Sequence, residues 1–358
     1  MVRSVASEIR EWCQLRAGEW DTLLLGNGFS RGVSPRFAYE RLVESAGLGS
    51  RLRAILKSCE STDFERGLLS IEHTLDVLGA LERCAHDEGD ETVVKTIEAL
   101  DLIALRGELH DGLIHAVHSS HPKASDIDSD VKSDVRAALA SMKDVFTTNY
   151  DLLPYWCLLD GGQLIDYFWS SYEAGLRFER SNAEDVASRR RRGATGTALY
   201  YLHGALHLRE TADGVRTDKI RRDVKRVGHL LETITHRWNE DPDMLPLFVS
   251  EGCTELKVER IERSPYLKFA SEQLAIGERD VVVFGAAFHE QDAHIWRSLC
   301  AGARKVAVSI YRPSGIDPVS HQEYMQKVQG YLVGCDLDFF WSDTHPLGAL
   351  GPARQRAV

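Results

Sequence analysis

The nine residues TLLLGNGFS at positions 22–30 pass directly from an apolar run into a pair of glycines. Three consecutive leucines are typical of a strand buried on both faces, because a strand with one wet face alternates polar and apolar residues. Gly26 and Gly28 permit a tight turn and a close approach of the backbone to a ligand, and a helix-compatible segment ending at Gly47 follows. The sequence therefore predicts a strand, a glycine-containing turn and a helix at 18–48.

Short apolar runs of the same kind recur from residue 143 onward. They are DVFTTNYD (144–151), ALYYLHG (198–204), LPLFVSEG (245–252), DVVVFGAAF (280–288), KVAVSIYRP (305–313) and LDFFW (337–341). Helices are expected between them, notably at 217–238, 265–278 and 289–301, and a mobile loop is expected at 181–197. Apolar strands separated by helices predict an α/β fold, in which a Rossmann-like parallel sheet carries helices on both faces. Such sheets bind their ligands at the carboxyl ends of the strands.

A large helical insert is predicted after the first strand and helix. Apolar residues over 64–81 recur at spacings of three and four, which places them on one face of a helix. We predict an inserted helical bundle at 51–141. The Rossmann-type domain then consists of residues 1–50 and 142–345, and a tail follows at 346–358.

Composition narrows the class of protein. The chain has 358 residues, of which 43% are hydrophobic and 27% charged, and these shares are near globular averages. A formal net charge of −11 argues against a chain that coats nucleic acid or an anionic membrane. The arginine run at 189–192 leaves a local nucleic-acid contact open as the less favoured alternative to a solvated loop.

The seven cysteines include no CxxC pair, so neither a disulfide framework nor a cysteine-rich zinc module is predicted, and no metal is expected. No apolar run approaches the roughly 18 residues of a membrane span. The N-terminal segment carries charges where a secretion signal needs its apolar core. We therefore expect a cytoplasmic protein without a membrane partner.

Four of the expected strands end in motifs that can carry chemistry. GNGFS at 26–30 offers backbone amides to a phosphate, and TTNYD at 147–151 offers hydroxyl, amide and carboxylate groups to a sugar. His203 and Gly204 follow the strand ALYYL, and GAAF at 285–288 ends the next core strand. Because the carboxyl ends of parallel strands meet at one edge of a sheet, these motifs are expected to share one crevice.

Each motif also has a purely structural interpretation. The glycines can serve the turn alone, Asp151 can cap the helix that follows it, and a lone histidine at a strand end is more often structural. A cap needs only one such residue, whereas this loop combines threonine, asparagine and aspartate. The expected convergence of the strand ends favours a functional role for His203 as well.

The motifs GNGFS, TTNYD, LHG and GAAF, in this order, resemble those of the sirtuin-like family. GNGFS resembles the Gly-Ala-Gly phosphate loop of that family, and LHG resembles its catalytic His-Gly pair. TTNYD resembles its Thr-Gln-Asn-Ile-Asp motif, with Thr148 in place of glutamine, and GAAF stands where a Gly-Thr/Tyr-Ser motif follows the next core strand. The resemblance covers about 18–50 and 143–313, while the helical insert matches only loosely.

The resemblance implies an NAD-binding site. The residues implied to contact the dinucleotide are Gly26, Asn27, Gly28 and Ser30 at the diphosphate, Thr148 and Gly285 in the matching motifs, and Ser309 near the adenosine. Asn149 and Asp151 are implied to contact the nicotinamide ribose and the nicotinamide pocket. His203 is implied to be the catalytic base.

The chain departs from deacylase sirtuins in one respect. Those enzymes usually carry a four-cysteine zinc module between the His-Gly and Gly-Thr-Ser motifs, whereas here only Cys253 lies between Gly204 and Gly285. Zinc-less members with helical insertions resemble bacterial NAD glycohydrolases that destroy NAD during phage infection. We therefore expect an anti-phage enzyme that hydrolyses NAD to nicotinamide and ADP-ribose and is regulated by homo-oligomerisation or a partner protein. The alternatives are an NAD-dependent deacylase or ADP-ribosyltransferase, and a non-catalytic sensor of NAD or ADP-ribose.

Overall fold

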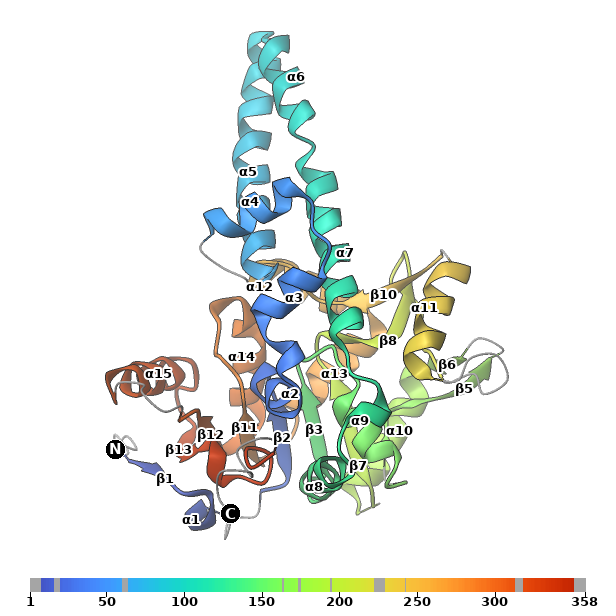
Figure 1. Cartoon of the computed structure of the whole chain (residues 1–358), viewed down its shortest axis with the longest axis vertical. Helices are drawn as coiled ribbons and strands as arrows, with labels where there is room; N and C mark the ends of the chain where they lie inside the picture. The colour runs from blue at the N-terminus through green and yellow to red at the C-terminus, as the bar shows by residue number, and fades with distance from the viewer. Residues whose placement is uncertain are drawn as a thin grey trace.

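Eight parallel strands form the central sheet of the protein, in the order β1-β13-β12-β11-β2-β3-β7-β4. The computed structural model describes residues 8–15, 20–59, 64–162, 164–172, 175–193, 195–221, 229–241, 243–312 and 318–350. The strands are β1 (Ile9–Arg10), β2 (Thr22–Leu25), β3 (Asp144–Thr147), β4 (Leu164–Ile165), β7 (Thr197–Tyr201), β11 (Arg279–Phe284), β12 (Ala303–Ile310) and β13 (Asp336–Trp341). Figure 1 shows this sheet in the lower half of the molecule.

The six main strands follow the Rossmann order. Counted along the chain as β2, β3, β7, β11, β12 and β13, they lie in the sheet as 3-2-1-4-5-6. The strand order reverses between β2 and β11, which pair directly from Thr22–Val281 to Leu25–Phe284. This confirms the predicted α/β, Rossmann-like fold, and it places the topological switch point beside the GNGFS motif.

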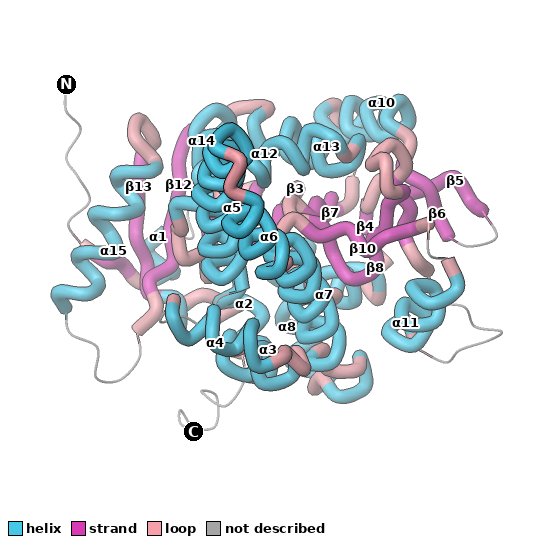
Figure 2. The backbone as a smooth tube through the Cα atoms, turned by 90° about the horizontal axis from the view of Figure 1, so that it is seen from above, coloured by secondary structure: helices cyan, strands magenta, loops and turns pink. Residues whose placement is uncertain are grey.

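Helices cover both faces of the sheet, as Figure 2 shows. On one face lie α2 (Asn27–Val33) and α8 (Ser129–Ala140), with α9 (Leu153–Leu159) packed against α8. On the other face lie α13 (Pro265–Ala275) and α14 (Ala293–Gly302). The central strands are buried from both sides, since the three leucines of β2 and the three valines of β11 are at most 1% exposed. That burial explains why their sequences do not alternate.

A helical arm formed by α5 (Phe64–Glu88), α6 (Glu91–Leu100) and α7 (Leu102–Ser120) projects from the body (Figure 1). The chain runs out along α5 and returns along α6 and α7, and α3 (Tyr39–Ser45) packs on α7 near the base. The shorter α4 (Ser50–Ser58) contacts α5. Several large apolar side chains of the arm are exposed, namely Val77, Leu81, Val93, Leu100 and Ile103.

A second sheet, which is antiparallel, was not expected from the sequence. Its strands are β5 (Phe168–Tyr172), β6 (Gly175–Phe178), β8 (Gly204–Thr211), β9 (Thr217–Lys219) and β10 (Met244–Phe248), in the order β10-β8-β9-β6-β5. The run at 245–252 therefore belongs to this sheet rather than to the parallel one. The helix expected at 217–238 is also wrong at its start, because a hairpin turn at Asp213-Gly214, with a φ of +75° at the glycine, returns the chain into β9.

The expected loop at 181–197 is instead mostly a helix, α10 (Arg180–Arg191). Ala183 and Ala187 are buried on one face, and exposed pairs such as Arg180 with Glu184 support the other. In the run at 189–192, Arg190 is buried and binds Asp144 Oδ1 at 2.6 Å. This arginine therefore has a structural partner, whereas Arg189 and Arg192 remain exposed.

The remaining helices complete the layers. They are α1 (Trp12–Leu15), α11 (Leu230–Glu240), α12 (Thr254–Arg263) and α15 (Pro318–Tyr331), with short 3₁₀ turns η1 (Pro35–Phe37), η2 (Ala124–Asp126), η3 (Glu290–Asp292) and η4 (Ser342–Thr344). Among the described residues, no helix combines the length and the apolarity that crossing a membrane requires. Residues 351–358 of the expected tail, and 222–228 within the expected 217–238 helix, lie outside the described part of the chain.

Candidate functional site

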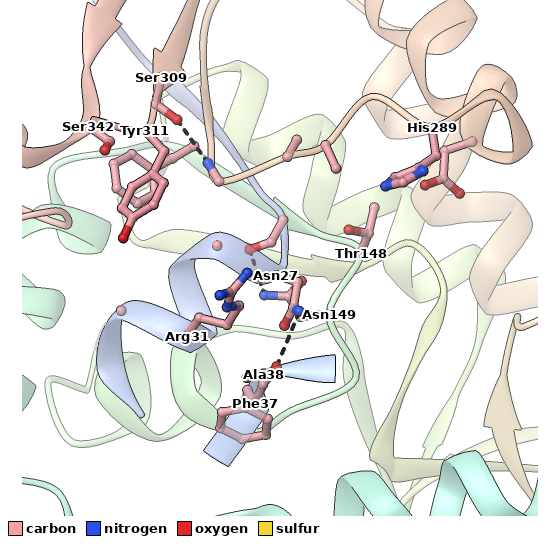
Figure 3. A pocket seen from close by; sticks show the side chains of 18 of the residues that line it. Asn27, Arg31, Phe37, Ala38, Thr148, Asn149, His289, Ser309, Tyr311 and Ser342 are labelled. Carbon is pink, nitrogen blue, oxygen red and sulfur yellow. Dashed lines mark hydrogen bonds between the residues drawn. The ribbon is translucent and has the colours of Figure 1, made fainter. Parts of the chain in front are cut away.

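A cavity of about 640 Å³ lies at the carboxyl ends of β2, β3, β11 and β12 (Figure 3). Its volume is within the range of roughly 300–1,000 Å³ that small-molecule sites occupy. The lining includes nine of the ten residues singled out from the sequence, namely Gly26, Asn27, Gly28, Thr148, Asn149, Asp151, His203, Gly285 and Ser309. The tenth, Ser30, is fully buried behind the lining. The expected shared crevice is thus present at the switch point.

The loops after β2 and β11 touch each other through their backbones at this point. The amide of Gly26 donates to the carbonyl of Phe284 at 2.9 Å, and that of Gly28 donates to the carbonyl of Gly285 at 2.8 Å. A Cβ on Gly28 would lie 2.7 Å from Cα of Gly285, and Gly285 has a φ of +72°. This loop contact requires glycine at these positions independently of any ligand.

Ser30 connects the two polar groups of the TTNYD loop. Its hydroxyl donates to Asp151 Oδ2 at 2.5 Å and accepts from Asn149 Nδ2 at 2.7 Å. The same amide nitrogen donates to the carbonyl of Gly26 at 3.0 Å. Both protons of the Asn149 amide are therefore held by the protein, and the orientation of the side chain is fixed. Ser30 does not line the cavity itself; it orients Asp151 and Asn149 through these hydrogen bonds.

Asp151 has both a structural and an electrostatic role. Its Oδ1 accepts from the backbone amide of Leu153, the first residue of α9, at 2.9 Å. The N-cap position itself is occupied by Leu152, so Asp151 lies one residue before the cap that the structural interpretation predicted. Its side chain is almost fully buried. Burial raises the pKa of Asp151 to about 6, against the opposing effect of the hydrogen bonds from Ser30 and Leu153. A pKa of about 6 leaves the carboxyl group mostly ionised at neutral pH, although its buried position disfavours the charge.

His203 lies in the tight connection between β7 and β8. Gly204 after it has a φ of +83°, and a Cβ there would lie 1.9 Å from the carbonyl oxygen of Leu247, so the backbone accepts only glycine. Nε2 of His203 lies 3.1 Å from Nε2 of His294 on α14 and 3.9 Å from Oδ1 of Asp292. The imidazole is thus held at the cavity wall by a second, buried histidine.

A buried ion cluster stands behind this histidine pair. Nζ of Lys257, on α12, is completely buried and lies 2.5 Å from Oε2 of Glu65 and 2.8 Å from Oδ1 of Asp292. Burial opposes the charge on Asp292, but Lys257 and the histidines outweigh it and bring the pKa of Asp292 to about 2. Two carboxylates thus share the ammonium of Lys257 beside His203.

Both histidines are uncharged at neutral pH. Burial is the main cause and lowers the pKa of His203 far below its ordinary value and that of His294 to about 4. Lys257 lowers the pKa of each further, while Asp292 raises it. Of the charged groups near His203, Asp292 favours a positive charge on the ring, and Lys257 opposes it more strongly.

The same residues bear on metal binding. One ligand atom each of His203, Asp292 and His294 lie within 4.8 Å of one another, a separation that a metal ion could bridge. However, the ammonium of Lys257 already binds the Asp292 carboxylate and would repel a cation placed there. We interpret the group as a hydrogen-bonded cluster, and the expectation of a metal-independent site stays a prediction.

The far end of the cavity lies beyond β12. Oγ of Ser309 accepts the amide of Gly285 at 2.9 Å, which joins the ends of β11 and β12. Tyr311 is exposed at the rim, and the hydroxyl of Tyr324, on α15, donates to the carbonyl of Ala286 at 2.6 Å. Arg31 lies beside Asn27 and is the single lysine or arginine among the described lining residues.

A comparison with known protein families shows to which family the chain belongs. Residues 23–347 match a family described as a domain of unknown function (DUF4917). The chain belongs to the DUF4917 family. No curated protein sequence matches it. In this DUF4917 protein the matched region includes every strand end that lines the cavity, so the site is a part of the family domain and not an appendage to it.

Sequence reasoning missed several side chains of the site. Arg31 follows Asn27 by four residues in α2, so the helical period alone could have placed both on one face. Lys257 and Glu65 are separated by 192 residues, and no local pattern connects them. His294 follows the GAAF motif by only a few residues but gave no signal, because its role depends on how α14 packs.

Proposed function

We propose that this DUF4917 protein is a sirtuin-like NAD glycohydrolase, which cleaves NAD to nicotinamide and ADP-ribose. The observation that carries the proposal is the convergence of all four strand-end motifs on one cavity at the switch point. In parallel sheets of this strand order, that location is where dinucleotides bind. The family resemblance of the motifs supplies the identity of the dinucleotide.

The charges around the cavity are compatible with this substrate. Arg31 offers a positive charge to a diphosphate beside the GNGFS loop. Asp151 and the fixed amide of Asn149 lie together at the end of β3, where they would face the nicotinamide ribose. The glycosidic bond breaks through an oxocarbenium-like state, and a buried carboxylate stabilises positive charge that develops near it.

His203 supplies the general base in this proposal. The C1′–N bond to nicotinamide breaks, a bond from C1′ to a water oxygen forms, and one proton of that water passes to His203. The imidazole is neutral at physiological pH, as a base must be, and Asp292, whose Oδ1 lies 3.9 Å from its Nε2, favours the imidazolium against the opposing effects of burial and Lys257. No redox change accompanies the step.

A nicotinamide-release assay tests the proposal directly. The purified full-length protein is incubated with NAD, and nicotinamide and ADP-ribose are quantified for the wild type and for the variants Asn149→Ala, His203→Ala and His207→Ala. His207 is also buried on β8 but does not line the cavity, so its variant is the matched control. We expect a loss of at least about 10²-fold for the first two variants and retained release for the third.

The same assay separates the alternatives. Turnover that requires an acylated peptide or a protein acceptor would replace hydrolysis with deacylation or ADP-ribosyl transfer. Tight binding of NAD or ADP-ribose without any release of nicotinamide would identify a sensor and overturn the enzymatic proposal.

The biological role that we infer is anti-phage defence by depletion of NAD. Unregulated expression is then expected to be toxic, and His203→Ala is expected to remove the toxicity. Intracellular NAD measured after phage challenge, with and without this variant, distinguishes defence from a housekeeping activity. The molecular mass of the active form in solution tests the expected regulation by homo-oligomerisation or by a partner protein.

A further inference from the structure

His203 is bound through one particular nitrogen. Its Nε2 lies 3.1 Å from Nε2 of His294, so one ring must donate a proton and the other must accept it. Among the described residues, Nδ1 of His203 has no hydrogen-bond partner. His203 lines the cavity, whereas His294 does not, although both rings are buried. A ligand in the cavity therefore meets His203 from the side away from His294.

The direction of the hydrogen bond follows from the role proposed for His203. A base must present a lone pair to its substrate, and Nε2 of His203 is already engaged with His294. A neutral imidazole carries one N–H and one lone pair, so a lone pair on Nδ1 places the proton on Nε2. Nε2 of His203 then donates its proton to Nε2 of His294.

We propose that His294 is a positioning residue, which fixes the tautomer of His203 so that Nδ1 is the atom that takes up the proton. This inference rests on the proposed function, but the tautomer can be observed in the protein without substrate. The proton leaves the attacking water and binds Nδ1 of His203, while the Nε2 proton stays in the bond to His294.

The charged groups around the pair support this arrangement. Asp292 approaches His203 Nε2 to 3.9 Å from η3, and Lys257 of α12 holds the same carboxylate. Arg297, one turn further along α14, also lowers the pKa of His294. Burial keeps His294 neutral and able to accept, and Lys257 and Arg297 lower its pKa further, whereas Asp292 raises it.

Two substitutions of His294 distinguish positioning from packing. His294→Gln places an amide oxygen near the position of Nε2 and can still accept from His203. His294→Leu keeps a buried apolar volume but leaves the Nε2 proton of His203 without an acceptor. The full-length protein, labelled with ¹⁵N-histidine, reports the tautomer of His203 by NMR without any substrate. His207→Leu is the control, because it removes a different buried histidine, on β8, that does not line the cavity.

We expect the wild type and His294→Gln to show His203 protonated on Nε2, and His294→Leu to lose this single form. In the nicotinamide assay we expect kcat to fall at least tenfold in His294→Leu, with KM little changed, and to recover in His294→Gln. An unchanged His203 tautomer in folded His294→Leu would overturn the inference. A wild type with the expected tautomer but no nicotinamide release would refute the proposed function while leaving the positioning role supported.

Discussion

The hydroxyl of Ser30 donates a 2.5 Å hydrogen bond to the carboxylate of Asp151, which lies 121 residues further along the chain. This bond joins helix α2, at the switch point, to the loop after β3. Because the same hydroxyl accepts from Asn149, the geometry of two candidate catalytic groups depends on one buried serine.

Replacing this serine should therefore weaken both stability and activity. Ser30→Ala removes one donor to Asp151 and one acceptor for Asn149, and a buried partner left unsatisfied costs about 1–3 kcal/mol. We expect a loss of that size in the free energy of unfolding, measured by denaturant titration, and a fall in kcat. Ser30→Thr retains the hydroxyl and serves as the control. Equal kcat in Ser30→Ala and the wild type would show that the bond does not position the site.

The raised pKa of Asp151, about 6 against 3.8 for an ordinary aspartate, predicts a defined pH dependence. The folded protein holds the proton between pH 4 and 6, whereas the unfolded chain has released it. This contribution to stability is therefore present at low pH and is lost as pH rises through about 6.

Asp151→Asn removes the titration and isolates its effect from that of the histidines. The free energy of unfolding of the variant, relative to the wild type, should increase between pH 4 and 6 by about 1.4 kcal/mol per unit of pKa shift. Parallel denaturant titrations at several pH values measure it. A difference that is flat over this range would contradict a raised pKa for Asp151.

The contact between the loops after β2 and β11 predicts that Gly285→Ala is severely destabilising. The added methyl group would lie 2.6 Å from the backbone nitrogen of Phe29, in addition to the cost of a φ of +72°. Gly162→Ala is the matched control, since Gly162 has a φ of +67° and nothing within 4 Å of the added Cβ. We expect about 1–2 kcal/mol for the control and above 4 kcal/mol for Gly285→Ala. Equal losses would mean that the loops separate easily.

The ion cluster gives a further prediction. Lys257→Met removes a fully buried ammonium from the carboxylates of Glu65 and Asp292, which are about one-fifth exposed, and breaking a buried pair costs up to about 3–5 kcal/mol. Lys95→Met breaks the exposed pair with Glu91 and should cost less than about 1 kcal/mol. Thermal and denaturant unfolding of both variants measure the contrast. If Lys257→Met unfolds as readily as Lys95→Met, water or the histidines compensate the carboxylates.

The strand ends could be predicted from the sequence because their meeting point follows from topology alone. Once β2, β3, β7 and β11 are recognised as parallel, the residues after them must share one edge of the sheet. The antiparallel sheet was missed because a short apolar run such as 245–252 does not reveal the direction of its partner. The arginine run at 189–192 was likewise predicted to be a solvated loop. The burial of the Arg190 side chain depends on its ion pair with Asp144, which is distant in the sequence.

The partners of His203 lay beyond sequence reasoning for a related reason. Asp292 lies four residues after the GAAF motif, where the sequence leaves a functional role and a helix-start role equally open. Lys257 and Glu65 are ordinary residues within their own helices. Only the fold brings these residues of α5, α12 and η3 together into one electrostatic unit. Convergence of strand ends is a property of the fold class, whereas this cluster is a property of the individual chain.

The helical arm has a mechanical consequence. Helix α5 is continuous for 25 residues, which corresponds to about 37 Å, and its first turn supplies Glu65 to the ion cluster and Phe64 to the cavity wall. The base of the arm is therefore part of the cavity wall, while its tip projects away from the body. A displacement imposed on the tip of the arm at Glu88 would be transmitted along this single helix to the carboxylate of Glu65, which binds Lys257 and lies 23 residues away.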